Sequence, residues 1–189
     1  MFANGVWTPD PTFLVSPEEY QRQFQIKRQY KSKMKVFSYM LGFVGEENRR
    51  VLYRNAVMKI GNLLGGDVEI DEVRPFGTLS YWLSSIASSD YVVTNSFHGI
   101  CFSILFNRPF LALGFEGEQA WRNERALDVL GRFCLSDRFV TLDNCQQIDI
   151  SVAQSWDWDE INCLRAAYAQ IGVDFLSLAL SSGGELGRD

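Results

Sequence analysis

Short apolar runs alternate along the chain with longer stretches in which apolar residues recur every three or four positions. A short apolar run bounded by turn residues is typical of a strand in a covered sheet. The run YVVT at residues 91–94 fits this pattern best, because it is apolar or β-branched throughout. We predict strands at residues 36–43, 68–73, 91–94 and 110–113, and an edge strand at residues 139–142.

The stretches with helical spacing lie between these runs. Residues 46–64 carry apolar positions at helical spacing and end at a Gly-Gly pair, which is a common stop signal. A shorter helix at residues 16–24 has Ser16 as its N-cap and Pro17 as its first residue. We predict the remaining helices at residues 78–88, 99–106, 123–130 and 157–180. The last of these carries an apolar stripe of the kind that faces a core, made up of Ile161, Leu164, Tyr168, Ile171, Phe175 and Leu178.

Regular alternation of strands and helices with short connections predicts an α/β fold. We expect a Rossmann-like parallel sheet with helices on both faces. Residues 1–30 form a lead-in segment in this interpretation, with Pro9 and Pro11 keeping the chain extended. Residues 31–180 then form the domain, and residues 181–189 are a polar tail that we expect to be disordered.

The only histidine of the chain, His98, follows the predicted strand 91–94. In parallel sheets, ligands bind beyond the carboxyl ends of the strands, where Ser96 and His98 are expected to meet a helix N-terminus. Free N–H groups and the positive end of the helix dipole suit an anion such as phosphate or carboxylate there. The sequence therefore predicts an anion site at this junction.

Each residue of the junction also has a structural interpretation. His98 either serves as a general acid or phosphate ligand, or caps its own helix. Ser96 binds phosphate or acts as a plain N-cap, and the two roles are compatible. Asn95 serves either a turn or a ligand, while Gly99 allows a close approach of helix, strand or ligand.

Composition narrows the class of protein. A formal net charge of −5 without a basic run argues against a dedicated nucleic-acid binder. No apolar run approaches the roughly 20 residues needed to cross a bilayer, and the first residues lack the pattern of a signal peptide. The four cysteines form no C-x-x-C pair. We expect a cytoplasmic, reduced protein that uses neither a metal nor a cofactor.

Three segments together carry a family resemblance. The block DYVVTNSFHGICFSILFNRPF, residues 90–110, resembles the characteristic segment of the polysaccharide pyruvyl transferase family. DPTFL, residues 10–14, resembles an element at that family's domain junction, and RALDVLGRFCLSDR from Arg125 resembles its closing segment. The resemblance covers roughly residues 8–140 and points to the C-terminal half of such a protein.

The resemblance implies a two-domain fold like that of glycosyltransferases of the B type, with the N-terminal domain missing from this chain. It also implies transfer of pyruvate from phosphoenolpyruvate to a sugar acceptor, which gives a cyclic ketal and phosphate. That reaction needs a site for a trianion, a general acid and stabilisation of an oxocarbenium-like centre. His98 is the catalytic candidate, and the isolated half is expected to be inactive alone.

Three residues outside the junction, Arg125, Arg74 and Glu116, complete the candidate site. Arg125 faces the anionic donor or pairs with a neighbouring acidic residue on its own helix. Arg74 follows the second predicted strand and binds the donor or lies in a solvated loop. Glu116 orients a sugar hydroxyl, acts as a base, or belongs to a flexible acidic loop. Trp121 nearby could stack on a sugar ring.

Two other classes of function stay open at this point. One is a glycosyltransferase-like domain with a nucleotide-sugar donor, although the sequence has no Gly-rich phosphate loop. The other is a non-catalytic carbohydrate-assembly domain, or an inactive fragment. The surface that would meet the missing half makes a homo-oligomer an additional expectation.

Overall fold

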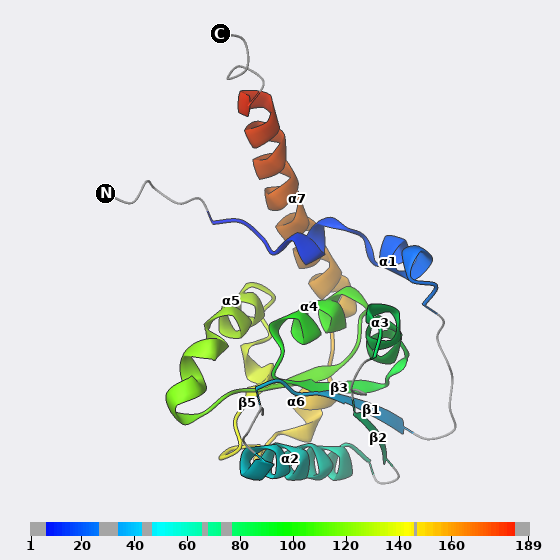
Figure 1. The fold of residues 1–189 in the computed structure, drawn as a ribbon, viewed down its shortest axis with the longest axis vertical. Helices are drawn as coiled ribbons and strands as arrows, with labels where there is room; N and C mark the ends of the chain where they lie inside the picture. The colour runs from blue at the N-terminus through cyan, green and yellow to red at the C-terminus, as the bar shows by residue number, and fades with distance from the viewer. Residues whose placement is uncertain are drawn as a thin grey trace.

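The computed structural model describes residues 7–26, 34–42, 47–65, 68–72, 77–145 and 147–183. In this part of the chain a five-stranded parallel sheet lies between two layers of helices (Figure 1). The strand order is β2-β1-β3-β4-β5, which confirms the expected Rossmann-like α/β fold. The strands are β1 (Met34–Tyr39), β2 (Val68–Glu72), β3 (Tyr91–Thr94), β4 (Phe110–Leu113) and β5 (Phe139–Val140).

Successive residues of the central strands enter opposite cores, because side chains alternate across a strand. In β3, Val92 belongs to the core under one helix layer, and Tyr91 and Val93 belong to the other. In β4, Phe110 and Leu111 divide in the same way. The uniformly apolar sequence of these strands thus reflects burial on both faces.

The two helix layers differ in size. On one face lie α2 (Glu47–Gly65) and the short α6 (Ile150–Gln154). On the other lie α3 (Leu79–Ser88), α4 (Phe97–Leu105) and α5 (Glu124–Arg132) (Figure 1). Two 3-10 turns, η2 (Gly117–Asn123) and η3 (Ser136–Arg138), flank α5.

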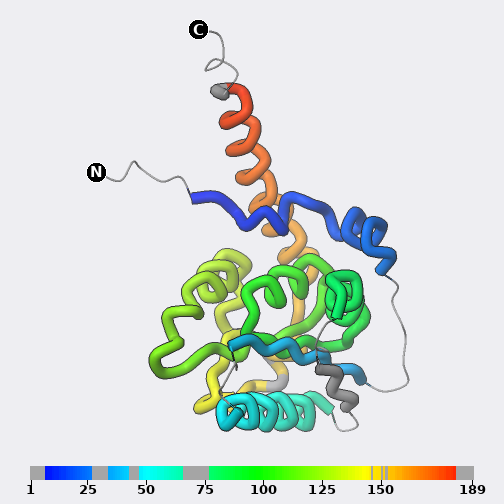
Figure 2. The backbone as a smooth tube through the Cα atoms, viewed as in Figure 1, coloured from blue at the N-terminus to red at the C-terminus, as the bar shows by residue number. Residues whose placement is uncertain are grey.

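The lead-in segment is not simply extended. Pro11–Leu14 forms the 3-10 turn η1, with Asp10 as its N-cap, and Pro17–Gln23 forms α1, with Ser16 as its N-cap. Phe13 is buried and stacks on Phe133 at a ring-centroid distance of 5.5 Å. The segment crosses α7 and passes over α4 (Figure 2). It therefore belongs to the core of the domain.

The last helix, α7 (Trp158–Gly183), packs on the domain with its first half only. Ile161 and Tyr168 of the predicted stripe are buried, whereas Ile171, Phe175 and Leu178 are exposed. The expectation of one continuous buried stripe was wrong, because the helix extends past the domain. The helix also includes residues 181–183 of the expected disordered tail, and residues 184–189 lie outside the described part.

By length and composition alone, the 24 residues Trp158–Ser181 could cross a membrane. The stretch contains no unbroken apolar run of about 20 residues, as expected from the sequence, and it meets the criterion only through its average hydropathy. A single helix of this kind is weak evidence for a membrane protein. Its inner half packs against η1 of this domain.

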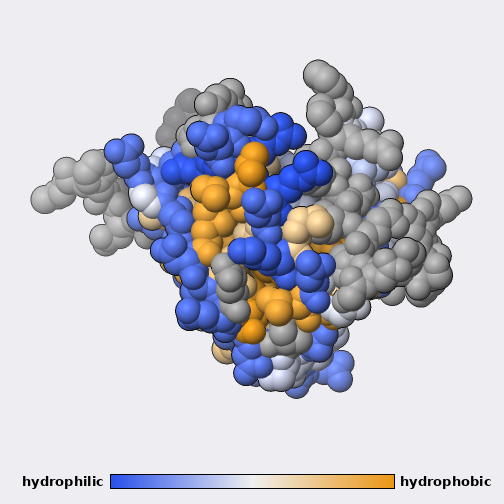
Figure 3. Space-filling model, turned by 90° about the horizontal axis from the view of Figure 1, so that it is seen from below, coloured by the Kyte–Doolittle hydropathy of each residue, from blue (hydrophilic) through white to orange (hydrophobic). Residues whose placement is uncertain are grey.

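Exposed apolar side chains also occur on α2, at Val51, Leu52, Met58 and Leu63. Figure 3 views the molecule from the α2 side and shows apolar patches separated by polar residues. The apolar surface on this side is thus gathered into patches rather than scattered as single residues.

We predict that the free energy of unfolding falls as the pH rises from about 10 towards 12. Burial raises the pKa of Tyr53 and of Tyr168 from the usual 10 to about 12, and it raises that of Tyr91 further. The folded state thus favours the neutral hydroxyls. The contribution of these tyrosines to the free energy of unfolding is fully present below about pH 10, their pKa in the unfolded state. It is lost as the pH rises and the groups ionise. Urea unfolding across this range, with tyrosinate absorbance as a second signal, measures the effect.

Tyr53→Phe is the informative variant for this prediction. The Tyr53 hydroxyl donates a 2.7 Å hydrogen bond to the Gly114 carbonyl, so its loss lowers stability at neutral pH by about 1 kcal/mol. The variant should also show a shallower decline of stability above about pH 10. A wild-type stability that stays constant through this range contradicts the prediction.

Candidate functional site

The strand order places a topological switch point between β1 and β3. The chain leaves β1 to form β2 on one side, and then returns to form β3 on the other side of β1. The connections on the two sides diverge and leave a crevice beyond the carboxyl ends of β1 and β3, where ligands bind in open α/β sheets.

Two side chains at the end of β3 tie it to the end of β1. Thr94 Oγ1 donates a 2.6 Å hydrogen bond to the Tyr39 carbonyl and accepts from the Ser96 N–H at 3.0 Å. The Asn95 amide donates to the Leu41 carbonyl at 2.9 Å and accepts from the Leu41 N–H at 2.6 Å. The Asn95 side chain thus uses both its amide N–H and its carbonyl oxygen to bind the backbone, which is a structural role.

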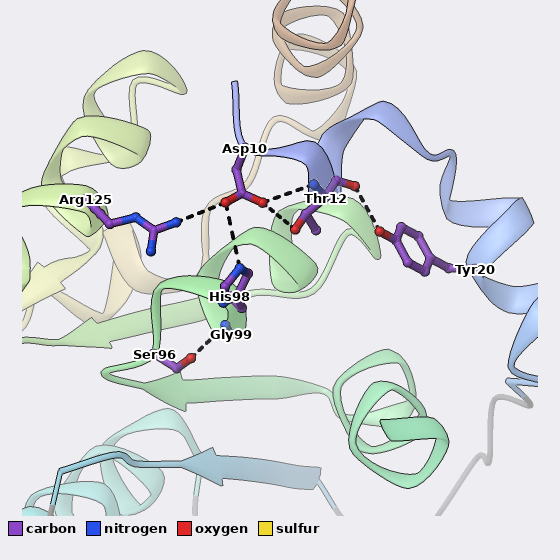
Figure 4. Close-up of polar contacts among 7 residues, drawn as sticks. All are labelled: Asp10, Thr12, Tyr20, Ser96, His98, Gly99 and Arg125. Atoms are coloured by element: carbon purple, nitrogen blue, oxygen red, sulfur yellow. Dashed lines mark hydrogen bonds and ion pairs between the residues drawn. The ribbon is translucent and has the colours of Figure 1, made fainter. Parts of the chain in front are cut away.

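Helix α4 begins directly after this tie. Ser96 caps it, since its Oγ accepts from the Gly99 N–H at 3.2 Å, and the helix starts at Phe97, two residues earlier than predicted (Figure 4). His98 therefore lies in the first turn of the helix. Gly99 lies so close to β3 that a Cβ atom there would be 2.6 Å from Thr94 Oγ1. This is the close helix–strand approach expected from the sequence.

Asp10, from the lead-in segment, is the residue that connects the predicted site residues. Its Oδ1 accepts from both the N–H and the hydroxyl of Thr12, at 3.0 and 2.5 Å. Its Oδ2 accepts from Arg125 Nη2 at 3.0 Å and lies 3.7 Å from His98 Nε2, an ion-pair distance (Figure 4). The Asp10 side chain is only 12% exposed. One carboxylate thus faces the two cationic candidates.

Arg125 is fixed from two directions. Besides its bond to Asp10, its guanidinium carbon lies 3.8 Å from the centroid of the Phe97 ring. Its partner is therefore neither of the acidic neighbours on its own helix, Glu124 and Asp128, which the sequence offered as alternatives. Phe97 and His98 are adjacent in α4, so this contact brings α5 against the start of α4.

A cavity of about 670 Å³ occupies the switch point. We call it the switch-point cavity. His98 and Ser96 line it from α4, and Thr78, the N-cap of α3, lines it from a second helix start. Its other walls are largely aromatic, from Tyr20, Tyr39, Trp82 and Phe102.

Two of these aromatic walls carry hydroxyl groups. Burial raises the pKa of Tyr39, and burial together with the Asp10 carboxylate raises that of Tyr20. Both side chains therefore remain neutral donors at physiological pH. The Tyr20 hydroxyl lies 3.3 Å from the Thr12 carbonyl and donates to it.

A second cavity, of about 460 Å³, adjoins Asp10 and Arg125. We call it the junction cavity, because residues 7–11 of the lead-in form one wall. The other walls come from α4, α5 and α7, through Phe97, Glu124, Asp128 and Tyr168. Arg125 lines this cavity and is not among the residues of the switch-point cavity.

Two predicted site residues lie elsewhere. Arg74 is outside the described residues, so its predicted role stays untested. Glu116 accepts a 3.2 Å hydrogen bond from the Asp143 N–H and is not among the described residues that line either cavity. Within the described ranges, no group of three or more His, Cys, Asp and Glu side chains is placed to hold a metal ion.

Sequence reasoning found the helix junction but not the role of Asp10. The sequence did mark Asp10 as the first residue of the DPTFL element. Its contact with Arg125 spans 115 positions, which no local pattern reveals. The aromatic lining by Tyr20 and Trp82 was missed for the same reason.

Comparison with known proteins adds a family match. The family model for polysaccharide pyruvyl transferase matches residues 1–116, which include β1 to β4 and the whole of α4. The matched region contains Asp10 and His98 and ends before Arg125. No curated protein sequence matches the chain significantly.

One solved structure is similar in part. A crystal structure described as the glycotransferase of kitacinnamycin shares 14% sequence identity with this chain, at a TM-score of 0.49. The similarity covers 76% of this chain and 41% of the solved chain. The chain thus corresponds to less than half the length of that protein.

We predict that Gly99→Ala lowers the free energy of unfolding by about 1–3 kcal/mol, because the new methyl group displaces Thr94 from its bond to β1. Gly131→Ala in α5 is the matched control. Apart from its chain neighbours and the backbone of its own helix, no described atom lies within 4 Å of a Cβ at that position, so alanine there should raise stability by roughly 0.5–1 kcal/mol. Urea denaturation of both variants measures the difference. Equal effects of the two substitutions would contradict the close approach.

Proposed function

Since the chain belongs to the polysaccharide pyruvyl transferase family, we propose that it takes part in the transfer of pyruvate from phosphoenolpyruvate to a sugar. The donor binds in the switch-point cavity, and two sugar hydroxyls receive the pyruvyl carbon as a cyclic ketal. Phosphate is the other product.

One observation carries this proposal. His98, the single histidine of the chain, lies in the first turn of α4 and lines a cavity at which α3 also begins. Each helix start offers N–H groups and positive dipole character to a phosphate or carboxylate. A compact anion with two acidic ends, such as phosphoenolpyruvate, fits between two such starts.

In this proposal His98 is the general acid. Transfer requires a proton on the terminal enol carbon of the donor, which leaves positive charge at the carbon that bears the phosphate oxygen. A sugar hydroxyl adds to that carbon and loses its proton. Phosphate then leaves with the electrons of its C–O bond, and the second hydroxyl adds to the resulting oxocarbenium carbon and loses its proton, which closes the ketal. The Asp10 carboxylate, 3.7 Å from His98 Nε2, stabilises the protonated imidazole between steps.

The charged groups that line the switch-point cavity determine the affinity that we expect for phosphoenolpyruvate. The described residues that line it include no Arg and no Lys, so His98 and the helix starts provide the positive character. Binding of a trianion to this chain should therefore be weak and strongly dependent on His98.

We predict that phosphoenolpyruvate binds the chain and that His98→Gln abolishes the binding, because glutamine keeps a polar group but cannot carry the charge. Calorimetric titration at low ionic strength measures both proteins, and circular dichroism verifies that the variant is folded. Glu116→Gln is the matched control, since Glu116 lines neither cavity, and it should bind like the wild type.

Two results would count against the proposal. Equal affinity of the wild type and His98→Gln for phosphoenolpyruvate removes His98 from the site. Thermal stabilisation by UDP or GDP, without any by phosphoenolpyruvate, favours a nucleotide-sugar donor in the same cavity instead.

A further inference from the structure

The junction cavity differs in character from the switch-point cavity. Three carboxylates line it, from Asp10, Glu124 and Asp128, against the single guanidinium of Arg125. An acidic lining repels phosphoenolpyruvate but accepts hydrogen bonds from uncharged hydroxyl groups. Its volume of about 460 Å³ is within the range of about 300–1,000 Å³ that is usual for small-molecule sites.

An aromatic side chain stands at the edge of this cavity. Trp7 is 39% exposed, and the guanidinium carbon of Arg132 lies 3.4 Å from its ring centroid. Asp128 in turn accepts from Arg132 Nε with both carboxylate oxygens, at 3.1 and 3.0 Å. Tyr168 also packs on the indole, at a ring-centroid distance of 5.4 Å. The indole is thus held in place before any ligand arrives, and its exposed part offers an apolar surface to a sugar ring.

Two polar groups of the lining have unused hydrogen-bonding capacity. The Glu124 carboxylate and the Tyr168 hydroxyl make no hydrogen bond or ion pair with any other described residue. Both line the cavity, one from the start of α5 and one from α7. An acceptor and a neutral donor at separate points suit a molecule with several hydroxyls.

We propose that the junction cavity binds the neutral sugar that accepts the pyruvyl group. The inference rests on the proposed function, which places the donor on the opposite side of Asp10. Asp10 lines the junction cavity, and its carboxylate faces His98 of the switch-point cavity at 3.7 Å. A sugar seated against Trp7 and Glu124 can therefore present hydroxyls beside Asp10, next to the donor.

The chemistry of the lining also specifies the class of acceptor. Arg125 and Arg132 pair with Asp10 and Asp128, so the Glu124 carboxylate is the charge left without an ion pair among the described residues of the lining. That negative charge disfavours a uronic acid or any other anionic sugar and favours a neutral hexoside.

The test is saturation-transfer NMR and titration of the chain with the methyl pyranosides of galactose, mannose and glucose, and with glucuronate as the anionic comparator. At least one neutral glycoside should bind and glucuronate should not. Glu124→Gln and Tyr168→Phe should each weaken that binding by about tenfold, since the first removes the charge of an acceptor and the second removes a donor hydroxyl.

Trp7→Ala should abolish the binding, and Trp121→Ala is its control, because Trp121 is 70% exposed and lines neither cavity. Glu124→Gln is nearly isosteric at an exposed position, so it tests the site without affecting the fold. The inference is overturned if no neutral glycoside binds at tens of millimolar, if binding persists unchanged in Trp7→Ala and Glu124→Gln, or if glucuronate binds better.

Failure of this inference and failure of the proposed function give different results. Phosphoenolpyruvate binding that depends on His98, without glycoside binding, overturns only the acceptor site. Glycoside binding that depends on Trp7 and Glu124, without phosphoenolpyruvate binding, overturns the donor assignment and leaves a sugar site.

Discussion

The tie between the ends of β1 and β3 is the constraint on which the functional edge of this protein depends. Thr94 and Asn95 satisfy backbone groups of Tyr39 and Leu41 that would otherwise need water in a partly buried crevice. The same Thr94 oxygen receives the Ser96 N–H and contacts Gly99. The direction in which α4 leaves the sheet is therefore set by these contacts, and so is the position of His98.

The second organising contact comes from outside the sheet. Asp10 belongs to a segment that precedes β1, yet its carboxylate lies between Arg125 of α5 and His98 of α4. Phe13, three residues later, anchors that segment in the core against Phe133 and Tyr168. The buried aromatic ring thus fixes the position of a charged group that faces both cavities, which links the packing of the domain to the electrostatics of its candidate site.

Prediction from the sequence succeeded where a local pattern determined the structure. Strands β3 and β4 occur at the predicted residues, because a strand buried on both faces must be apolar throughout. The start of α4 was predicted two residues late, since Ser96 is a strong N-cap that is not followed by the usual acidic residue at the third position.

The contacts of the site were not predictable in the same way. The pairing of Asp10 with Arg125 joins positions 115 residues apart, and the packing of the lead-in, in which Phe13 is buried, brings them together. Arg125 has acidic neighbours one and three positions away, Glu124 and Asp128. A sequence-based prediction favours such near neighbours as ion-pair partners. Likewise, helical periodicity predicted an apolar stripe along α7 but could not indicate where the domain beneath it ends.

The outer part of α7 extends beyond the domain, and this affects how that part of the helix behaves. From Val173 to Ser181 every residue is exposed, so in this stretch the helix is supported by backbone hydrogen bonding and intrinsic propensity rather than by packing. Short helical stretches without packing are only marginally stable in water, and helix–coil relaxation takes about a microsecond or less. The inner turns, locked by Ile161 and Tyr168, do not share this equilibrium. A binding partner that covered Phe175 and Leu176 would therefore stabilise the outer turns of α7. The rest of the domain would not need to move.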